Sequence, residues 1–153
     1  MAAFGVRFRR CDAGVSAVEF ALFAPVLFFA LVAAVDLGVA EYERMTIDHA
    51  LRAGAQSAMA DQGADAVLKV VQSTASKNFT LSDQTAPSAT ALTVSVARFC
   101  ACAENTGVEV ACSTTCAGSS PTFIYYRLSG AKIYDGMTMP DMTLNPTVQV
   151  QIR

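Results

Sequence analysis

The sequence is poor in charged side chains and in histidine, and both shortages narrow what this chain can do. Charged residues make up 16% of its 153 residues, whereas soluble domains average about 25%, and the deficit is not spread evenly. The one histidine, His49, has no neighbouring partner for metal binding or proton transfer, and the sequence contains no nucleophile elbow or phosphate loop. We therefore expect no catalytic residue, no metal site and no cofactor. A net charge of −2 gives no reason to expect a nucleic acid as partner.

The charge deficit is concentrated in one apolar segment near the N-terminus. Residues 15–35 form a run of 21 residues in which only Ser16 and Glu19 are polar. As a helix this run is about 32 Å long, which matches a hydrocarbon core about 30 Å thick. Pro25 lies one third of the way along and is expected to kink the helix. The segment is predicted to cross a membrane once.

Basic residues stand on only one side of this segment. Arg7, Arg9 and Arg10 precede it, whereas Asp36 and two glutamates follow it before the next arginine. Basic residues that flank a span stay on the cytoplasmic side. The N-terminus is therefore expected in the cytoplasm and everything after residue 40 outside it.

The apolar run has two other interpretations. A secretory signal peptide cut after residues 32–34 would release a soluble domain that starts near Val35. Against it, the run exceeds the usual apolar core of about 7–15 residues and contains an acidic residue, Glu19. A buried core helix of a soluble protein is also disfavoured, because the run is apolar on every side.

Glu19 is the most informative residue of the run, since a carboxylate inside a span costs a few kcal/mol. One explanation is that Glu19 lies close enough to the cytoplasmic end of the span for its carboxylate to reach the interface. The other is that the carboxylate pairs with a cation inside the membrane. If the chain were cut after Gly14, the new amine of Val15, with an ordinary pKa near 8, could pair with Glu19 of a neighbouring subunit.

The residues from 14 onward resemble a known family. The run Gly14-Val-Ser-Ala-Val-Glu19-Phe20 is similar to a prepilin peptidase site of the Tad class, where a basic leader ends in Gly and the mature chain has Glu and then Phe or Tyr at its fifth and sixth positions. Further blocks complete a likeness to the TadE-like family of pilus assembly proteins over about residues 14–60: Ala17-Val-Glu-Phe-Ala-Leu22, Pro25, Asp36-Leu-Gly38 and Ala50-Leu-Arg-Ala-Gly-Ala55.

This resemblance implies roles for several residues. Gly14 would precede the bond that prepilin peptidase cuts, Val15 would begin the mature chain, and Glu19 and Phe20 would serve membrane extraction or subunit packing. The protein would be a minor pilin (pseudopilin) or a membrane-anchored assembly component of a Tad-type pilus, acting in pilus biogenesis and adhesion. Its partners would be membrane lipid, prepilin peptidase, other Tad pilins or pseudopilins, and assembly-platform proteins. It would lie in the bacterial inner membrane with its C-terminal domain in the periplasm.

The predicted fold class is α+β and pilin-like. A basic leader (1–14) precedes one long helix (15–61) that spans the membrane and extends into the periplasm, and a periplasmic domain follows (62–153). Small residues on the extended helix, Gly54 among them, are expected to allow close packing. Helix propensity explains the alanines of this segment but not Gly54, because glycine costs about 1 kcal/mol relative to alanine inside a helix. An amphipathic second helix is predicted over 64–77.

A small antiparallel sheet is predicted after the second helix. Alternating apolar residues indicate strands at 92–102 and 108–112, joined by a turn at 105–107, although Arg98 breaks the apolar face of the first strand. Further strands are expected at 123–128 and 147–153. The stretch 129–146 is interpreted as mostly loop, with one short strand at 132–134.

Four cysteines in the predicted sheet, Cys100, Cys102, Cys112 and Cys116, have the spacing C-x-C-x9-C-x3-C. Zinc is disfavoured, because C-x-C is tighter than the usual C-x2–4-C and the region is predicted to be extracytoplasmic. An even cysteine number outside the cell predicts two disulfides. The expected hairpin favours the pairs Cys102–Cys112 and Cys100–Cys116. A redox or metal enzyme using these thiols is the remaining alternative. Cys11 lies in the leader and would leave with it.

Overall fold

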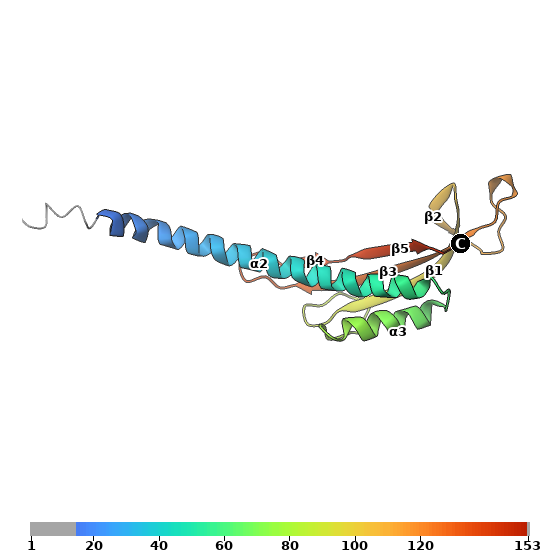
Figure 1. Ribbon diagram of the computed structural model, residues 1–153, viewed down its shortest axis with the longest axis horizontal. Helices are drawn as coiled ribbons and strands as arrows, with labels where there is room; N and C mark the ends of the chain where they lie inside the picture. The colour runs from blue at the N-terminus through green and yellow to red at the C-terminus, as the bar shows by residue number, and fades with distance from the viewer. Residues whose placement is uncertain (1–14, 153) are drawn as a thin grey trace, which may run out of the picture.

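The computed structural model describes residues 15–152 and has an α+β fold. A long helix, α2 (Val15–Ala58), is followed by a short helix, α3 (Ala64–Ala75), and then by a five-stranded antiparallel sheet. The N-terminal half of α2 projects far beyond the sheet (Figure 1). This arrangement confirms the predicted fold class. The predicted leader, 1–14, lies outside the described residues.

Helix α2 is continuous over 44 residues, which makes it about 66 Å long. It runs unbroken through Pro25, and the kink expected there stays a prediction. The helix ends at Ala58, three residues earlier than predicted. In residues 59–61 each backbone N–H donates to the carbonyl three residues back, and Asp61 has a left-handed φ of 47°. A tight turn with a left-handed residue is a common way to end a helix.

Helix α3 is amphipathic, as the sequence predicted. Its buried face consists of Val67, Val71 and Ala75, which recur at helical spacing. The helix ends at Ala75, where the predicted range extended to 77. The N–H groups of Asn78 and Phe79 both donate to the Ala75 carbonyl, so the chain turns away at that point.

The sheet has one long central strand. Its strands are β1 (Thr93–Cys102), β2 (Asn105–Val110), β3 (Phe123–Tyr134), β4 (Met142–Leu144) and β5 (Thr147–Gln151). β3 pairs with β1 along one edge and with both β4 and β5 along the other. β2 forms a hairpin with the far end of β1. All these pairs are antiparallel, as predicted.

The short strand expected at 132–134 is present as the end of β3, but the prediction that the rest of 129–146 is loop was wrong at 129–131 and 142–144. β3 continues unbroken through Ser129 and Gly130 to Tyr134, and β4 adds a short strand that the sequence did not indicate. Ser129 pairs opposite Ser95, and their hydroxyl oxygens lie 2.7 Å apart. A Cβ atom on Gly130 would lie only 2.6 Å from Cγ2 of Ile47 on α2. The glycine that interrupts the apolar pattern therefore lets the helix approach the strand.

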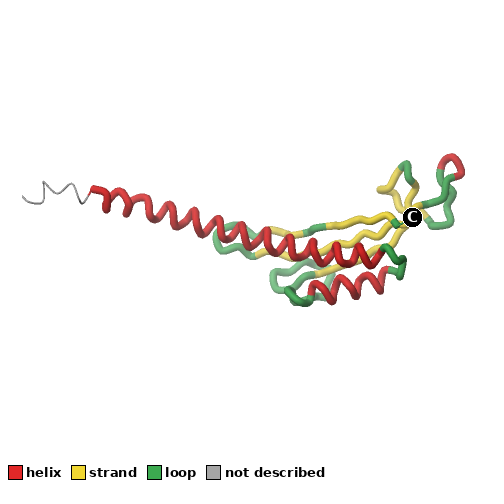
Figure 2. The backbone as a smooth tube through the Cα atoms, viewed as in Figure 1, coloured by secondary structure: helices red, strands yellow, loops and turns green. Residues whose placement is uncertain are grey.

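The two helices lie next to each other along the sheet (Figure 2). The buried core between helices and sheet draws residues from α2, α3, β3 and β4, together with Leu92, which directly precedes β1. Its largest fully buried members are Tyr126, Ile47, Leu51, Leu92, Leu128, Val67 and Val71. Because α2 contributes Ile47 and Leu51, its C-terminal half is an integral part of the domain, while the N-terminal half is free of it.

Candidate functional site

The N-terminal half of α2 is apolar and uncovered. Apart from the half-buried Val32, its large apolar side chains are about 60–70% exposed, from Val18 (62%) through Leu22 (71%) to Val35 (58%). The most apolar stretch has a mean hydropathy of 2.4 and contains no buried residue. Among the described residues this is the one helix long and apolar enough to cross a membrane. Since a soluble helix buries its apolar side, this exposure indicates a membrane anchor.

The residues predicted to act in processing and assembly lie at the start of this helix. Val15 is the first residue of α2, and Gly14 lies outside the described residues. Glu19 and Phe20 are both exposed, with Phe20 at 69%, and no residue of the sheet domain covers them. Their side chains are therefore open to lipid or to another subunit, and their predicted roles remain untested.

Helix α2 approaches the rest of the domain most closely at Gly54. A Cβ atom there would lie 2.3 Å from Cγ2 of Val71 on α3 and 2.7 Å from Cδ2 of Leu128 on β3. Both distances are far below van der Waals contact. The close packing predicted for the small residues of this segment is thus confirmed at Gly54. His49, by contrast, lies exposed on the helix surface, as expected.

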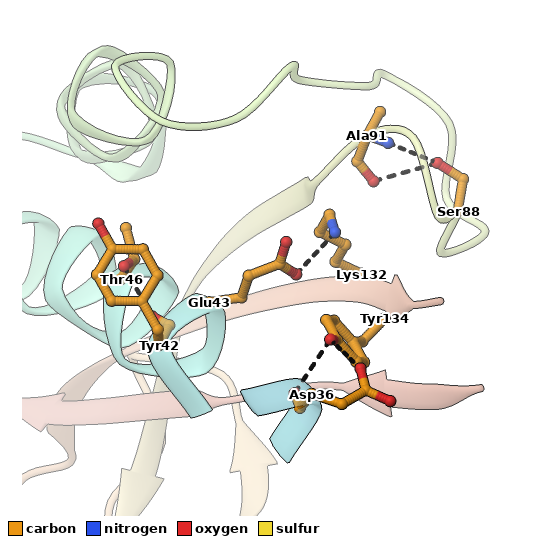
Figure 3. A network of polar contacts seen from close by, with 8 residues as sticks. All are labelled: Asp36, Tyr42, Glu43, Thr46, Ser88, Ala91, Lys132 and Tyr134. Atoms are coloured by element: carbon orange, nitrogen blue, oxygen red, sulfur yellow. Dashed lines mark hydrogen bonds and ion pairs between the residues drawn. The ribbon is translucent and has the colours of Figure 1, made fainter. Parts of the chain in front are cut away.

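A buried carboxylate joins α2 to the sheet where the apolar run ends. Asp36 is 3% exposed and accepts a hydrogen bond of 2.6 Å from the Tyr134 hydroxyl at the end of β3 (Figure 3). Its other oxygen accepts bonds from the Thr138 backbone N–H (2.8 Å), the Thr138 hydroxyl (3.0 Å) and the Met139 N–H (3.1 Å). One side chain therefore fixes both the end of β3 and the loop that follows it.

These bonds change the acidity of both partners. The Tyr134 hydroxyl and then the Thr138 amide, against an opposing effect of burial, hold the pKa of the Asp36 carboxyl well below its usual range. The hydrogen bond to Asp36, together with burial, raises the pKa of Tyr134 to about 12. Asp36 is therefore a carboxylate, and Tyr134 a neutral donor, across the whole physiological pH range.

Two ion pairs add to this attachment. Lys132 of β3 donates to Glu43 of α2 at 2.7 Å, and its side chain is only 11% exposed (Figure 3). At the other end of the domain Arg98 makes two hydrogen bonds to Asp61, at 2.8 and 3.0 Å. Arg98, which interrupts the apolar face of β1 in the sequence, is thus accounted for by a partner on the turn after α2.

The four predicted cysteines form two disulfides at the end of the sheet far from the apolar half of α2. The predicted pairing was wrong, because the bonds join Cys100 to Cys112 and Cys102 to Cys116. The hairpin turn lies at 103–104 and not at 105–107, and the register shifts between Ala101 and Cys102.

This register explains the connectivity. Cys100 pairs opposite Val110, only two residues from Cys112. Cys102 is left at the end of the hairpin, where the loop brings Cys116 to it. Glu104 has a carboxylate oxygen within 4.8 Å of both sulfur atoms of this second bond. Those sulfurs are joined to each other and are not available as thiolate ligands.

The sequence did not reveal the junction at Asp36. Asp36 was noted only as an acidic residue that flanks the apolar run, and its partners lie about 100 positions away along the chain. A single aspartate directly after a membrane-length apolar run was the available signal. Nothing in the sequence pairs it with Tyr134 or Thr138.

The fold and these contacts define a class of protein: a disulfide-bonded α+β domain carried on a bare apolar helix that is long enough to anchor it in a membrane. A family model described as TadE-like protein matches residues 14–56. The match covers the apolar half of α2 and nearly all of the half that packs on the sheet. It confirms the resemblance to TadE-like proteins over this region and indicates a role associated with Tad pili. No curated protein and no solved structure matched the chain.

Proposed function

We propose that this protein is a TadE-like minor pilin (pseudopilin) or membrane-held assembly component of a Tad-type pilus, acting in pilus biogenesis and adhesion. It works by anchoring and subunit packing and performs no catalysis of its own. The observation that carries this proposal is the uncovered apolar half of α2 with Glu19 near its start. A lipid bilayer or the helices of other subunits can cover such a surface, and the match at residues 14–56 supports the pilus setting.

The proposed location is the bacterial inner membrane, with the N-terminus in the cytoplasm and the domain in the periplasm. Three arginines before the apolar run favour this orientation. The two disulfides at the far end of the domain also favour it, because disulfides persist in oxidising compartments. Other Tad pilins or pseudopilins and assembly-platform proteins are the proposed partners.

The proposed processing step is cleavage between Gly14 and Val15 by prepilin peptidase. Cleavage would remove the basic leader with Cys11 and would place a free amine at Val15, the first residue of α2. Intact-mass measurement of the protein extracted from its native membrane tests this step. A mass that corresponds to a start at Val15 supports it, whereas a start at Met1 or near Val35 contradicts it.

Glu19 is proposed to pair with the Val15 amine of a neighbouring subunit during assembly. Glu19→Ala should leave the domain folded with both disulfides formed, because Glu19 contacts none of it, but should weaken or abolish pilus assembly. Glu41→Ala is a matched control on the same helix. The Glu41 side chain is 57% exposed, and its ion pair with Arg44 is long, at 3.8 Å. Normal piliation in the Glu19 variant would rule out the pair, and equal loss in both variants would point to a general helix defect.

The alternative is a secreted soluble domain released by signal peptidase. One observation favours it: the residues that α2 contributes to the core begin at Ala40, so a cut near Val35 would leave the core complete. This alternative predicts recovery of the native protein from the periplasm without detergent. Recovery only with detergent would exclude it.

A further inference from the structure

The loop between β3 (Phe123–Tyr134) and β4 (Met142–Leu144) carries an exposed methionine that no contact within the domain explains. Met137 is 83% exposed, the largest fraction among the exposed large apolar residues of the described chain. The loop around it is tightly folded. A Cβ on Gly136 would lie 2.7 Å from the Met139 carbonyl oxygen and 3.2 Å from Oδ2 of Asp36. The fold therefore holds Met137 outward on a fixed loop.

The loop is held at the level where α2 stops being apolar on all sides. Thr138 and Met139 donate to Asp36, and Asp36 directly follows the apolar run 15–35. Figure 1 shows the β3–β4 end of the sheet lying beside α2 on the side of the domain nearest the projecting half of that helix. Figure 3 shows Tyr134 reaching Asp36 at this end.

Simple distances put Met137 close to the end of the apolar run. If residues 15–35 fill the hydrocarbon core, Asp36 lies at its edge, and the headgroup layer beyond it is about 5–8 Å thick. The Thr138 amide nitrogen is 2.8 Å from Asp36, and Met137 is one residue away, about 3.8 Å between Cα atoms. Val35 and Leu37, at 58% and 50% exposure, continue the apolar surface along the helix at this level.

We propose that the β3–β4 loop is a second membrane contact, in which the Met137 side chain enters the lipid interface and sets the tilt of α2 and the domain together relative to the bilayer. The proposal rests on the proposed membrane anchoring. A lipid surface is the occupant that the geometry selects, because the loop is continuous with the apolar span and fixed at its end. Asp135 and Asp141 flank the loop and are both exposed, so the contact is apolar and should not be strengthened by anionic lipid.

Tryptophan fluorescence offers a direct test, because the chain has no tryptophan. Three single-tryptophan variants of the full chain are reconstituted in phosphatidylcholine nanodiscs with bromine near the carbonyl end of the acyl chains. Met137→Trp reports on the loop. Phe29→Trp, in the apolar half of α2, reports on anchoring. Met59→Trp, 62% exposed beyond the far end of α2, is the matched control for an exposed apolar residue distant from the membrane.

The proposal predicts that bromine quenches Met137→Trp and Phe29→Trp and leaves Met59→Trp unchanged. Quenching of Phe29→Trp alone would overturn the loop contact and leave the anchor intact. Absence of quenching in Phe29→Trp would instead contradict the anchor itself.

Because tryptophan itself favours membrane interfaces, a second measurement uses the native side chain. In the wild-type chain with ¹³C-labelled methionine methyl groups, a spin-labelled lipid should broaden the Met137 signal, assigned with Met137→Leu, and spare that of Met59. Equal signals for the two methionines would overturn the proposal.

Discussion

The contact at Gly54 allows the sharpest quantitative prediction, because two effects of opposite sign act there. Gly54→Ala adds a methyl group where the space is already filled by Val71 and Leu128, at 2.3 and 2.7 Å. Both neighbours are fully buried. Overpacking of a tight core costs about 1–3 kcal/mol, whereas alanine gains about 1 kcal/mol over glycine inside a helix. We expect Gly54→Ala to lower the free energy of unfolding by about 1 kcal/mol, since the stiff Val71 side chain cannot turn aside.

Gly38→Ala is the control for this prediction. Gly38 lies on the same helix but is exposed, and a Cβ there would meet nothing within 4 Å. Only the helix propensity then acts, so this variant should be as stable as the parent or more stable by up to about 1 kcal/mol. Urea unfolding of the full chain in detergent, followed by circular dichroism with both disulfides intact, measures the two differences.

A double variant tests the cause. Val71→Ala alone opens a cavity and destabilises the core, but the methyl group that Gly54→Ala introduces would fill part of it. The double variant should therefore be less destabilised than the sum of the two single changes. If Gly54→Ala proves as stable as Gly38→Ala, or if the double variant is simply additive, helix α2 does not lie as close to α3 and β3 as these distances require.

Two further predictions concern the junction and the disulfides. Because its pKa is lower in the folded state, the Asp36 carboxylate stabilises the fold above the ordinary aspartate pKa near 4, and this stabilisation is lost as the pH falls below that range. The Tm difference between wild type and Asp36→Asn should thus be large at pH 7 and shrink toward pH 2. For the disulfides, C100S/C112S and C102S/C116S should show no more free thiols than wild type, whereas C100S/C116S should show two more. The opposite counts would refute the hairpin register.

Elements with a regular apolar period could be predicted from the sequence. The alternation from Leu92 to Cys102 defined β1 to within one residue, and the stripe of Val67, Val71 and Ala75 defined α3. The apolar run defined the projecting half of α2. In each case the apolar side of the element faces only apolar surroundings, either the core or the proposed membrane. The spacing of apolar residues is therefore enough to predict the element and its length.

Elements whose form depends on distant contacts could not be predicted. The third strand was predicted to end at residue 128, although β3 continues through Gly130, the point where it accommodates Ile47 of α2. The disulfide pairing depended on a register shift between Ala101 and Cys102, and one shifted residue exchanges the faces of a strand. The role of Asp36 depended on Tyr134, 98 positions later. Each of these requires the tertiary structure, which a local pattern does not contain.

The junction at Asp36 also determines how the anchor and the domain act on each other. Over about one and a half turns of α2 the exposed fraction falls from 58% at Val35 to 3% at Asp36, rises to 50% at Leu37 and falls to 1% at Ala40. The domain therefore packs against α2 from Asp36, the first residue beyond the apolar run, to Ala58. No free linker separates the two parts within the described chain, so the domain cannot swing independently of its helix. A force applied to the domain reaches the apolar half of α2 directly, as extraction of a subunit from a membrane would require.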